Sequence, residues 1–195
     1  MKKIILASNS PRRRELLLAL GLEFEIIPDN TPEIMEKGLS PCETVKSLAK
    51  FKGENIRKTL SCDADAVIIS ADTVVAINNM ILGKPKDYDD AEKMLKMLSG
   101  NMHCVYTGVY VVENISGKSA NFYEKTEVFF KNLDINEIKD YINTGEPMDK
   151  AGAYGIQNFG SLFVEKLQGD YFNVVGLPVC ELGKVLNKDF GIKFF

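Results

Sequence analysis

The stretch that decides the fold is Ile4-Ile5-Leu6-Ala7-Ser8-Asn9-Ser10-Pro11-Arg12-Arg13-Arg14. Its four apolar residues predict a strand, and the polar residues that follow predict a tight turn. Pro11 suits the first position of a helix, because its missing N–H would have no partner there. Ser10 is then expected to be the N-cap, and Gly21 the residue that stops the helix. The stretch therefore predicts a strand, a turn and a helix in that order.

The three arginines of this stretch lie in the first turn of the predicted helix. The N-terminal end of a helix carries partial positive charge, so each cation there costs about 0.3–1 kcal/mol unless an anion offsets it. Free N–H groups, hydroxyls and guanidinium groups at a strand-to-helix turn favour phosphate. A solvated basic turn is the alternative, and this stretch alone leaves both interpretations open.

Length and charge exclude several classes of protein. The chain has 195 residues, enough for one large domain or two small lobes, and its net charge is −3. That charge does not fit a general nucleic-acid binder. We find no apolar run long enough to cross a membrane and no signal-peptide pattern. We therefore expect a protein that works without nucleic acid and without a membrane.

The cysteines and the single histidine, His103, indicate no metal framework. The four cysteines are far apart in the sequence, without a CxxC pair: Cys42, Cys62, Cys104 and Cys180. This argues against a zinc site and against a disulfide framework. We expect reduced, buried thiols in a cytoplasmic protein, and a histidine that is at the surface or has its hydrogen bonds satisfied rather than a catalytic one.

Periodicity and turn residues predict the remaining elements. Helices are expected over residues 11–20, 43–58, 88–98 and 134–144, with a last helix that ends near residue 186. Strands are expected over residues 24–27, 66–70, 103–113, 122–131 and 161–167, with a short extended piece at 172–175. Asn78-Asn79 is typical of a hairpin turn.

Asp72 follows the apolar run Ala66–Ser70 and has no cation beside it in the sequence. Because an unpaired buried carboxylate is costly, it should be paired, metal-bound or at a strand end that faces a cleft. A buried aspartate that accepts hydrogen bonds from a neighbouring turn is the alternative.

Several other polar residues could meet phosphate or a base. Lys84 lies in a Gly-Lys-Pro turn, and Lys150 and Gln157 lie in the glycine-rich stretch 146–157. An exposed loop lysine and a mobile connector are the alternatives for these positions. Lys52 on the predicted helix 43–58 is, taken alone, typical of a solvated lysine.

The chain resembles the Maf family of nucleoside triphosphate pyrophosphatases. The matching stretches occur in the family's order and span nearly the whole chain: residues 6–13, 71–75, 83–85, 106–109, 149–157 and 174–178. The resemblance implies an α/β fold related to inosine triphosphate pyrophosphatases, with a long, twisted mixed sheet flanked by helices. It implies one domain over residues 1–195, with two lobes, a cleft between them and no clear linker.

The resemblance also implies a reaction, in which water cleaves a nucleoside triphosphate between its α- and β-phosphates to give a monophosphate and pyrophosphate. Asp72 is then the catalytic carboxylate. Arg12, Thr73 and Gln157 match the positions that select the substrate, and they resemble the branch that acts on dTTP and UTP. The family branch that acts on 7-methyl-GTP has a different set of residues at these selecting positions.

The residue chemistry agrees with this resemblance, because a triphosphate needs cations around it. The candidate substrate-binding residues are Ser8, Ser10, Arg12, Arg13, Lys52, Thr73, Lys84, Lys150 and Gln157. A divalent cation, Mg²⁺ or Mn²⁺, prefers oxygen ligands, and Glu33 and Asp72 are the ligands we choose.

The resemblance leaves two other functions open. One is a nucleotide-binding regulator of septum formation and cell division without significant turnover. The other is a broader house-cleaning hydrolase that acts on modified nucleotides. A homodimer is implied only by analogy with relatives.

Overall fold

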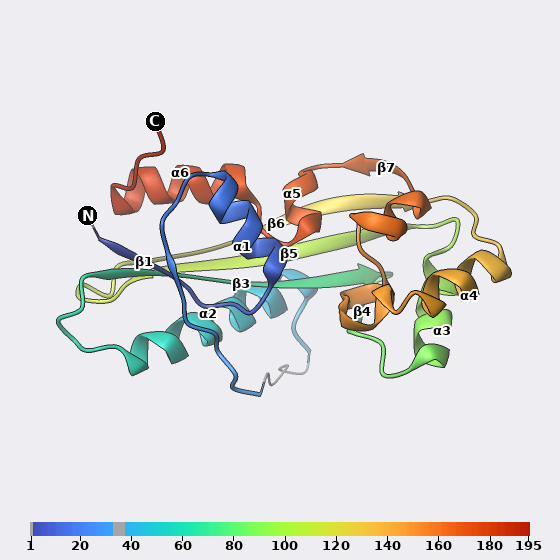
Figure 1. Cartoon of the computed structure of the whole chain (residues 1–195), viewed down its shortest axis with the longest axis horizontal. Helices are drawn as coiled ribbons and strands as arrows, with labels where there is room; N and C mark the ends of the chain where they lie inside the picture. Colours follow the sequence, from blue (N-terminus) through green and yellow to red (C-terminus); the bar gives the residue numbers. More distant parts are fainter. Residues whose placement is uncertain (1, 33–37) are drawn as a thin grey trace. The chain divides into compact units, whose positions relative to one another are not determined.

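Seven strands form one mixed sheet, which with its flanking helices gives the α/β fold predicted from the sequence (Figure 1). The structure is a computed structural model that describes residues 2–32 and 38–195. The strand order is β2-β1-β3-β5-β6-β7, and β4 pairs with β3 off this path.

The chain divides into two compact units. Unit 1 comprises residues 1–72, 107–124 and 176–195, and unit 2 comprises residues 73–106 and 125–175. Three long strands contribute residues to both units: β3 (Ala66–Ile77), β5 (Met102–Glu113) and β6 (Ser119–Phe130).

In unit 1, strand β1 (Lys3–Leu6) lies between β2 (Glu25–Ile26) and β3 and runs parallel to both. Residues 4–7 are all buried, as expected of a parallel strand covered on both faces. Their side chains alternate between two clusters, with Ile4 and Leu6 in one and Ile5 and Ala7 in the other.

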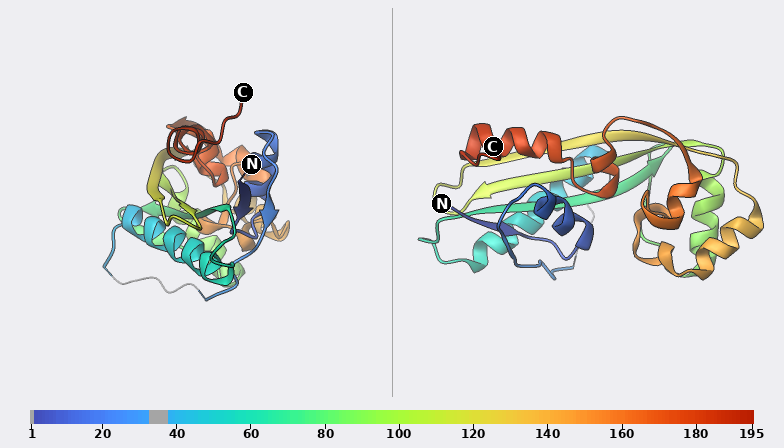
Figure 2. Two further views of the ribbon diagram at one scale, coloured as in Figure 1. Left: turned by 90° about the vertical axis from the view of Figure 1, so that its left-hand side faces the viewer. Right: turned by 45° about the horizontal axis from the view of Figure 1, so that its top comes forward.

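Each of these clusters is closed by helices. Helices α1 (Pro11–Ala19) and α6 (Val179–Phe190) supply Leu17, Leu182 and Leu186 to the first cluster. Helix α2 (Pro41–Thr59) supplies Ala49 and Ile56 to the second, from the opposite side of the strands (Figure 2). Unit 1 is therefore a layered arrangement of helix, sheet and helix.

Gly108 shows how closely α2 approaches β5. A Cβ atom at this glycine would lie 2.3 Å from the backbone oxygen of Val45 in α2. Because backbone atoms cannot give way as a side chain can, only glycine fits here. The close contact helps to seat α2, and with it Lys52, against the sheet.

Unit 2 has its own apolar core, built around Leu95 and Leu98 of α3 (Tyr88–Leu98) and Ile138 of α4 (Ile135–Asn143). Strand β4 (Met80–Leu82) returns antiparallel to β3 after a turn in which Asn78 and Asn79 adopt positive φ angles of 50° and 63°. This confirms the predicted hairpin. Strand β7 (Val164–Gln168) pairs antiparallel with β6.

A segment of three short 3₁₀ helices follows α4. These are η1 (Glu146–Asp149), η2 (Ala151–Ala153) and η3 (Asn158–Phe163). The glycine-rich stretch 146–157 thus contains two complete 3₁₀ turns. Residues 161–163, expected in a strand, belong to η3 instead, and β7 begins only at Val164.

The predicted extended piece at residues 172–175 is wrong, because α5 (Tyr171–Val175) is helical. Aromatic and β-branched residues favour strands, but Asp170 accepts a hydrogen bond from the N–H of Phe172 at 2.8 Å, as a helix cap does. Buried Asn173 also donates to the carbonyl of Val105 and to Thr126 Oγ1. Local hydrogen bonding therefore outweighs propensity here.

The cysteines are free, but the expectation that all are buried is wrong. Cys62 and Cys180 are exposed, and Cys42 and Cys104 are half-buried. Cys62 lies in the turn after α2, and Cys180 lies on a face of α6 that does not contact the core, so neither position requires an apolar neighbour.

His103 lies inside the core of unit 2, with 1% of its surface exposed. Its Nε2 atom is 2.7 Å from the hydroxyl of Tyr154, and its ring meets Phe130 edge-on with centroids 4.9 Å apart. Nδ1 has no hydrogen-bond partner among the described residues. Burial lowers the pKa of His103 to about 4, so the imidazole is neutral at neutral pH.

We expect this buried histidine to make the protein less stable in mild acid. Above pH 6.5 the imidazole is neutral in both the folded and the unfolded chain. As the pH falls from about 6.5 towards 4, the unfolded chain binds a proton that the folded chain does not, which costs up to about 3 kcal/mol. Urea unfolding at several pH values should show this loss in the wild type and a smaller one in His103→Gln. An identical pH dependence in both would contradict the expectation.

Candidate active site

The turn between β1 and α1 is built as the sequence predicted. Ser10 is the N-cap of α1, and its side chain accepts a hydrogen bond from the N–H of Arg13. Ser8 Oγ accepts from the N–H of Ser10 at 3.2 Å, which tightens the turn. Pro11 occupies the first helical turn, which has no acidic residue. The turn therefore places two hydroxyls and the arginines at a helix N-terminus.

Arg13 is buried and binds backbone carbonyls. Its Nε atom donates to the carbonyl of Gly176 at 2.8 Å, and Nη1 donates to the carbonyl of Ala71 at 2.9 Å. Nη1 also lies 3.3 Å from Ser8 Oγ. Part of its charge is thus offset by the protein itself, so the argument that every arginine of this turn needs an anion does not hold for Arg13. The side chain joins α1 to β3 directly beside Asp72.

Asp72 is paired with Lys52, whose Nζ atom lies 2.5 Å from Asp72 Oδ1. The two side chains are 12% and 13% exposed, so both are largely shielded from water. Of the three alternatives expected for this carboxylate, the structure shows the paired one, and Asp72 lies within β3, which continues to Ile77. The interpretation of Lys52 as a solvated helix lysine is wrong, because α2 directs it at this carboxylate.

Helix α2 holds Lys52 through a well-formed N-terminus. Ser40 is the N-cap, and the backbone N–H of Ser40 donates to the Glu43 carboxylate at 2.9 Å in a capping box. Val45, Leu48 and Ala49 are buried against the sheet. The lysine is therefore positioned by both capping and packing.

Asp29 is a second acidic residue near Lys52, and the sequence did not single it out. Its carboxylate accepts from Thr31 N and Oγ1 at 3.0 and 2.6 Å and from Asn55 Nδ2 at 3.2 Å. Burial raises the pKa of Asp29, but these hydrogen bonds and the charge of Lys52 outweigh it and leave the pKa lowered. Because Asp29 and Lys52 are distant in the sequence, no local pattern could have linked them.

Two further candidate residues belong to unit 1, and the structure describes only one of them. Arg12 is half-buried at the start of α1. Glu33, chosen as a metal ligand, lies outside the described residues. In unit 1, Ser8, Ser10 and Arg13 are joined in one group, and Lys52 and Asp72 form another. Arg13 reaches the carbonyl of Ala71, the residue before Asp72.

The candidates of unit 2 are Thr73, Lys84, Lys150 and Gln157. Thr73 is half-buried in β3, and Lys84 is exposed in the turn after β4. The carbonyl of Gly83, next to Lys84, accepts a hydrogen bond from the N–H of Gly152 at 3.0 Å. This bond joins the turn that carries Lys84 to the segment that carries Lys150 and Gln157.

Lys150 is held within its own segment. Its Nζ atom donates to the carbonyl of Glu146 at 2.6 Å and to Asp149 Oδ1 at 2.7 Å, and the side chain is 13% exposed. Gln157 is half-buried at the N-cap position of η3. Lys150 lies between η1 and η2, and Gln157 directly precedes η3, so both residues flank short 3₁₀ helices rather than lying in an irregular connector.

The donor chemistry around Asp72 fits a hard divalent cation. A carboxylate oxygen is the ligand type that Mg²⁺ and Mn²⁺ prefer, and such ions keep several waters, so one or two protein carboxylates suffice. Among residues 2–32 and 38–195, no group of three acidic, histidine or cysteine side chains forms a complete metal cage. The residues fit a cation shared with phosphate oxygens better than one enclosed by protein.

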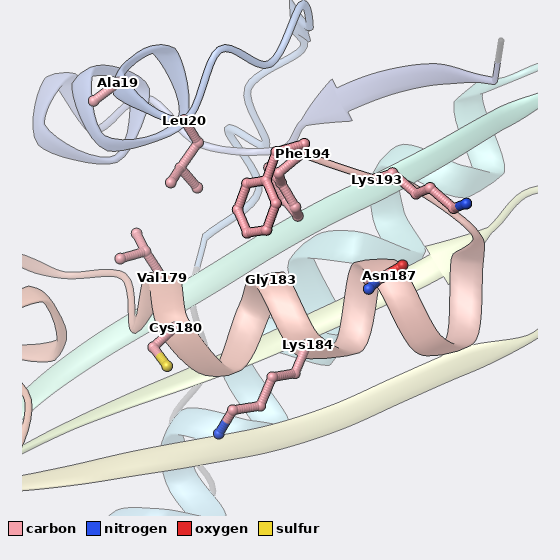
Figure 3. Close-up of a pocket in the computed structure, with 10 residues that line it drawn as sticks. Ala19, Leu20, Val179, Cys180, Gly183, Lys184, Asn187, Lys193 and Phe194 are labelled. Atoms are coloured by element: carbon pink, nitrogen blue, oxygen red, sulfur yellow. The ribbon is translucent and has the colours of Figure 1, made fainter.

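A cavity of about 700 Å³ lies elsewhere in unit 1, between α1, α6 and the C-terminal segment (Figure 3). Leu20, Val179 and Phe194 are among the apolar residues that line it. The residues that line it include none of the predicted site residues, so we place the candidate site at Asp72 rather than in this cavity. In the described part of the chain, no helix is both long and apolar enough to cross a bilayer.

The fold and this geometry define an α/β protein with a shielded, paired carboxylate in β3 and a helix N-terminus that carries hydroxyls and arginines. A family model described as Maf-like protein matches residues 3–189. The chain therefore belongs to the Maf-like family, which confirms the resemblance read from its motifs.

Its relatives are similar over nearly their whole length. Proteins named dTTP/UTP pyrophosphatase from Alkaliphilus oremlandii and Alkaliphilus metalliredigens are 52% and 49% identical over 192 residues, with 98% of each chain covered. One of the same name from Bacillus pumilus is 49% identical over 195 residues, with both chains covered completely. A solved dITP/XTP pyrophosphatase from Mycobacterium abscessus covers 97% of this chain and 94% of its own, with a TM-score of 0.47 and 14% identity. That last likeness is too weak to add to the fold already described.

We expect Lys52 and Asp72 to be energetically coupled. Lys52→Met leaves a shielded carboxylate without its cation, whereas the double variant Lys52→Met/Asp72→Asn leaves no charge unpaired. The free energies of unfolding of the wild type, the two single variants and the double variant should give a coupling energy of about 1–3 kcal/mol. Additive effects of the two substitutions would show that the pair does not interact in solution.

Proposed function

We propose that this chain hydrolyses dTTP and UTP to the nucleoside monophosphate and pyrophosphate. The observation that carries the proposal is the shielded Lys52–Asp72 pair in a strand whose preceding residue, Ala71, accepts a hydrogen bond from Arg13. The names of the relatives support the activity and the pyrimidine substrates. Those names denote an enzyme, so a nucleotide-binding regulator of septum formation is not favoured.

The charges of the candidate residues suit a triphosphate, which brings about four negative charges at neutral pH. Such a ligand is stabilised best by preorganised cations and N–H donors. In unit 1 these are the N-terminus of α1, Arg12 and Lys52, with Arg13 supporting the turn. In unit 2 we propose Lys84 and Lys150 for the same purpose.

Asp72 acts in this proposal as the catalytic carboxylate. A water oxygen attacks the α-phosphorus, the bond from that phosphorus to the bridging oxygen breaks, and pyrophosphate leaves with the bonding electrons. The carboxylate either accepts the proton of the attacking water or holds the metal. Lys52 orients the carboxylate through the contact at Oδ1. Hydroxyls of Ser8 and Ser10 can donate to phosphate oxygens at the helix N-terminus.

A divalent cation, Mg²⁺ or Mn²⁺, belongs to the proposal, with Asp72 and Glu33 as its protein ligands. When bound, such an ion neutralises charge on the phosphates and on the leaving pyrophosphate. A homodimer and action on modified pyrimidine nucleotides are further parts of the proposal that rest on the family resemblance alone. A cytoplasmic location is also part of it and rests on the free cysteines.

Asp72→Asn should abolish turnover while the protein stays folded. The amide keeps the shape of the side chain but can neither accept the proton nor hold a cation as a carboxylate does. We expect pyrophosphate release from dTTP to fall by at least about a thousandfold. Asp65→Asn makes the same change of charge in the turn before β3 and should keep its activity. Pyrophosphate release by Asp72→Asn at a rate near the wild type would remove this carboxylate from the mechanism.

Arg12 and Gln157 should control which nucleotide is used. Loss of a hydrogen-bonding side chain at a selecting position removes discrimination between bases, by roughly tenfold or more. We therefore expect Arg12→Ala and Gln157→Ala to change the ratios of kcat/KM among dTTP, UTP and CTP. Arg14→Ala, an exposed arginine of the same helix, should leave the ratios unchanged. Equal ratios in all four proteins would end this assignment.

A further inference from the structure

The segment 146–163 of unit 2 carries Lys150 and Gln157, yet its backbone is unusual. Gly152 and Ala153 have φ angles of 70° and 59°, and Asn158 has 56°. Alanine rarely adopts such a left-handed conformation, because its Cβ then crowds the backbone. Contacts elsewhere must therefore hold the segment in this shape.

Tyr154 provides the contact at the middle of the segment. It is buried, and its ring meets Phe130 and His103 edge-on, with centroids 4.6 and 5.3 Å apart. The Tyr154 hydroxyl lies 2.7 Å from His103 Nε2. Burial raises the pKa of Tyr154, so the hydroxyl keeps its proton. The contact between this hydroxyl and the imidazole is directional and is surrounded by apolar rings. It therefore specifies one orientation of the tyrosine side chain.

Two other contacts hold the segment on either side of this tyrosine. The N–H of Gly152 donates to the carbonyl of Gly83, and a Cβ on Gly152 would lie 2.9 Å from the side chain of Val75. Towards the other end, the Glu146 carboxylate accepts from the N–H groups of Phe159 and Gly160 at 3.2 and 3.3 Å.

The hydroxyl of Tyr141 donates to the same Glu146 carboxylate at 3.0 Å, so α4 is joined to this end of the segment. Lys150 precedes Tyr154 and Gln157 follows it. The contact between His103 and Tyr154 therefore lies between the two candidate substrate-binding side chains, where the backbone is most constrained.

We propose that His103 is a positioning residue for the reaction described above: its contact with Tyr154 fixes the segment that presents Lys150 and Gln157. The inference rests on the proposed function. The competing explanation is that the pair only stabilises unit 2. The two explanations differ in whether substrate binding changes at temperatures where the variant is fully folded.

Tyr154→Phe tests this most cleanly, because it removes the hydroxyl and keeps the ring in the core. We expect the KM for dTTP to rise roughly five- to tenfold with kcat changed by less than about twofold, since the displaced side chains act in binding. His103→Leu should have the same effect, and His103→Gln, whose amide can still meet the hydroxyl, should recover part of the affinity.

Tyr110→Phe is the matched control. Tyr110 is also buried, and its hydroxyl donates to Glu54 Oε1 at 2.5 Å, but it lies in unit 1. The Tyr110→Phe protein should lose about as much stability as Tyr154→Phe does, without a change of the KM for dTTP. Hydrogen exchange of peptides that cover residues 150–157 should speed up in Tyr154→Phe and not in Tyr110→Phe.

Affinity for α,β-imido-dTTP, which cannot be cleaved between these phosphates, separates the two proposals. A wild type that binds this analogue but releases no pyrophosphate from dTTP would reject the proposed function, and the change of affinity in Tyr154→Phe would still decide the inference. A folded Tyr154→Phe with unchanged affinity, or with unchanged exchange over residues 150–157, would overturn it.

Discussion

The Lys52–Asp72 ion pair is the interaction on which the rest of the candidate site depends. A carboxylate inside the buried strand β3 would be costly alone, so its cation has to come from another element. Helix α2 supplies this cation, and its close approach to the sheet at Gly108, where no side chain fits, helps to place it. Arg13 adds a second constraint, because its bonds to Ala71 and Gly176 hold α1 beside the same part of β3.

Most of the fold was predictable where local signals agree. Pro11, Ser10 and the apolar run before them defined the first strand and helix, and the helix expected over residues 88–98 matches α3 at both ends. Prediction failed at residues 172–175, where strand-forming side chains are bent into a helix by a cap at Asp170 and by bonds of Asn173. The cap is local but belongs to a residue outside the predicted piece, and the bonds of Asn173 reach distant residues, so neither leaves a periodic pattern.

The sequence predicted which residues are candidates for the site better than it predicted the contacts between them. Motifs singled out Asp72 and Arg13, but the sequence could not show that Lys52 is their neighbour or that Arg13 binds carbonyls. The contacts of Asp29 with Asn55 and of His103 with Tyr154 were not predictable for the same reason, since each joins residues far apart in the sequence. The spacing of residues in the sequence does not show which polar side chains of different helices and strands will contact one another.

The central claim is that the carboxylate held by Lys52 is where the triphosphate is cleaved. A crystal structure of the protein with α,β-imido-dTTP and Mn²⁺ tests it most directly. We expect the α-phosphate beside Asp72, with the metal or a water in hydrogen-bonding or coordinating contact with that carboxylate. An analogue bound away from Asp72, for example in the cavity between α1 and α6, with the ion pair undisturbed, would contradict the account.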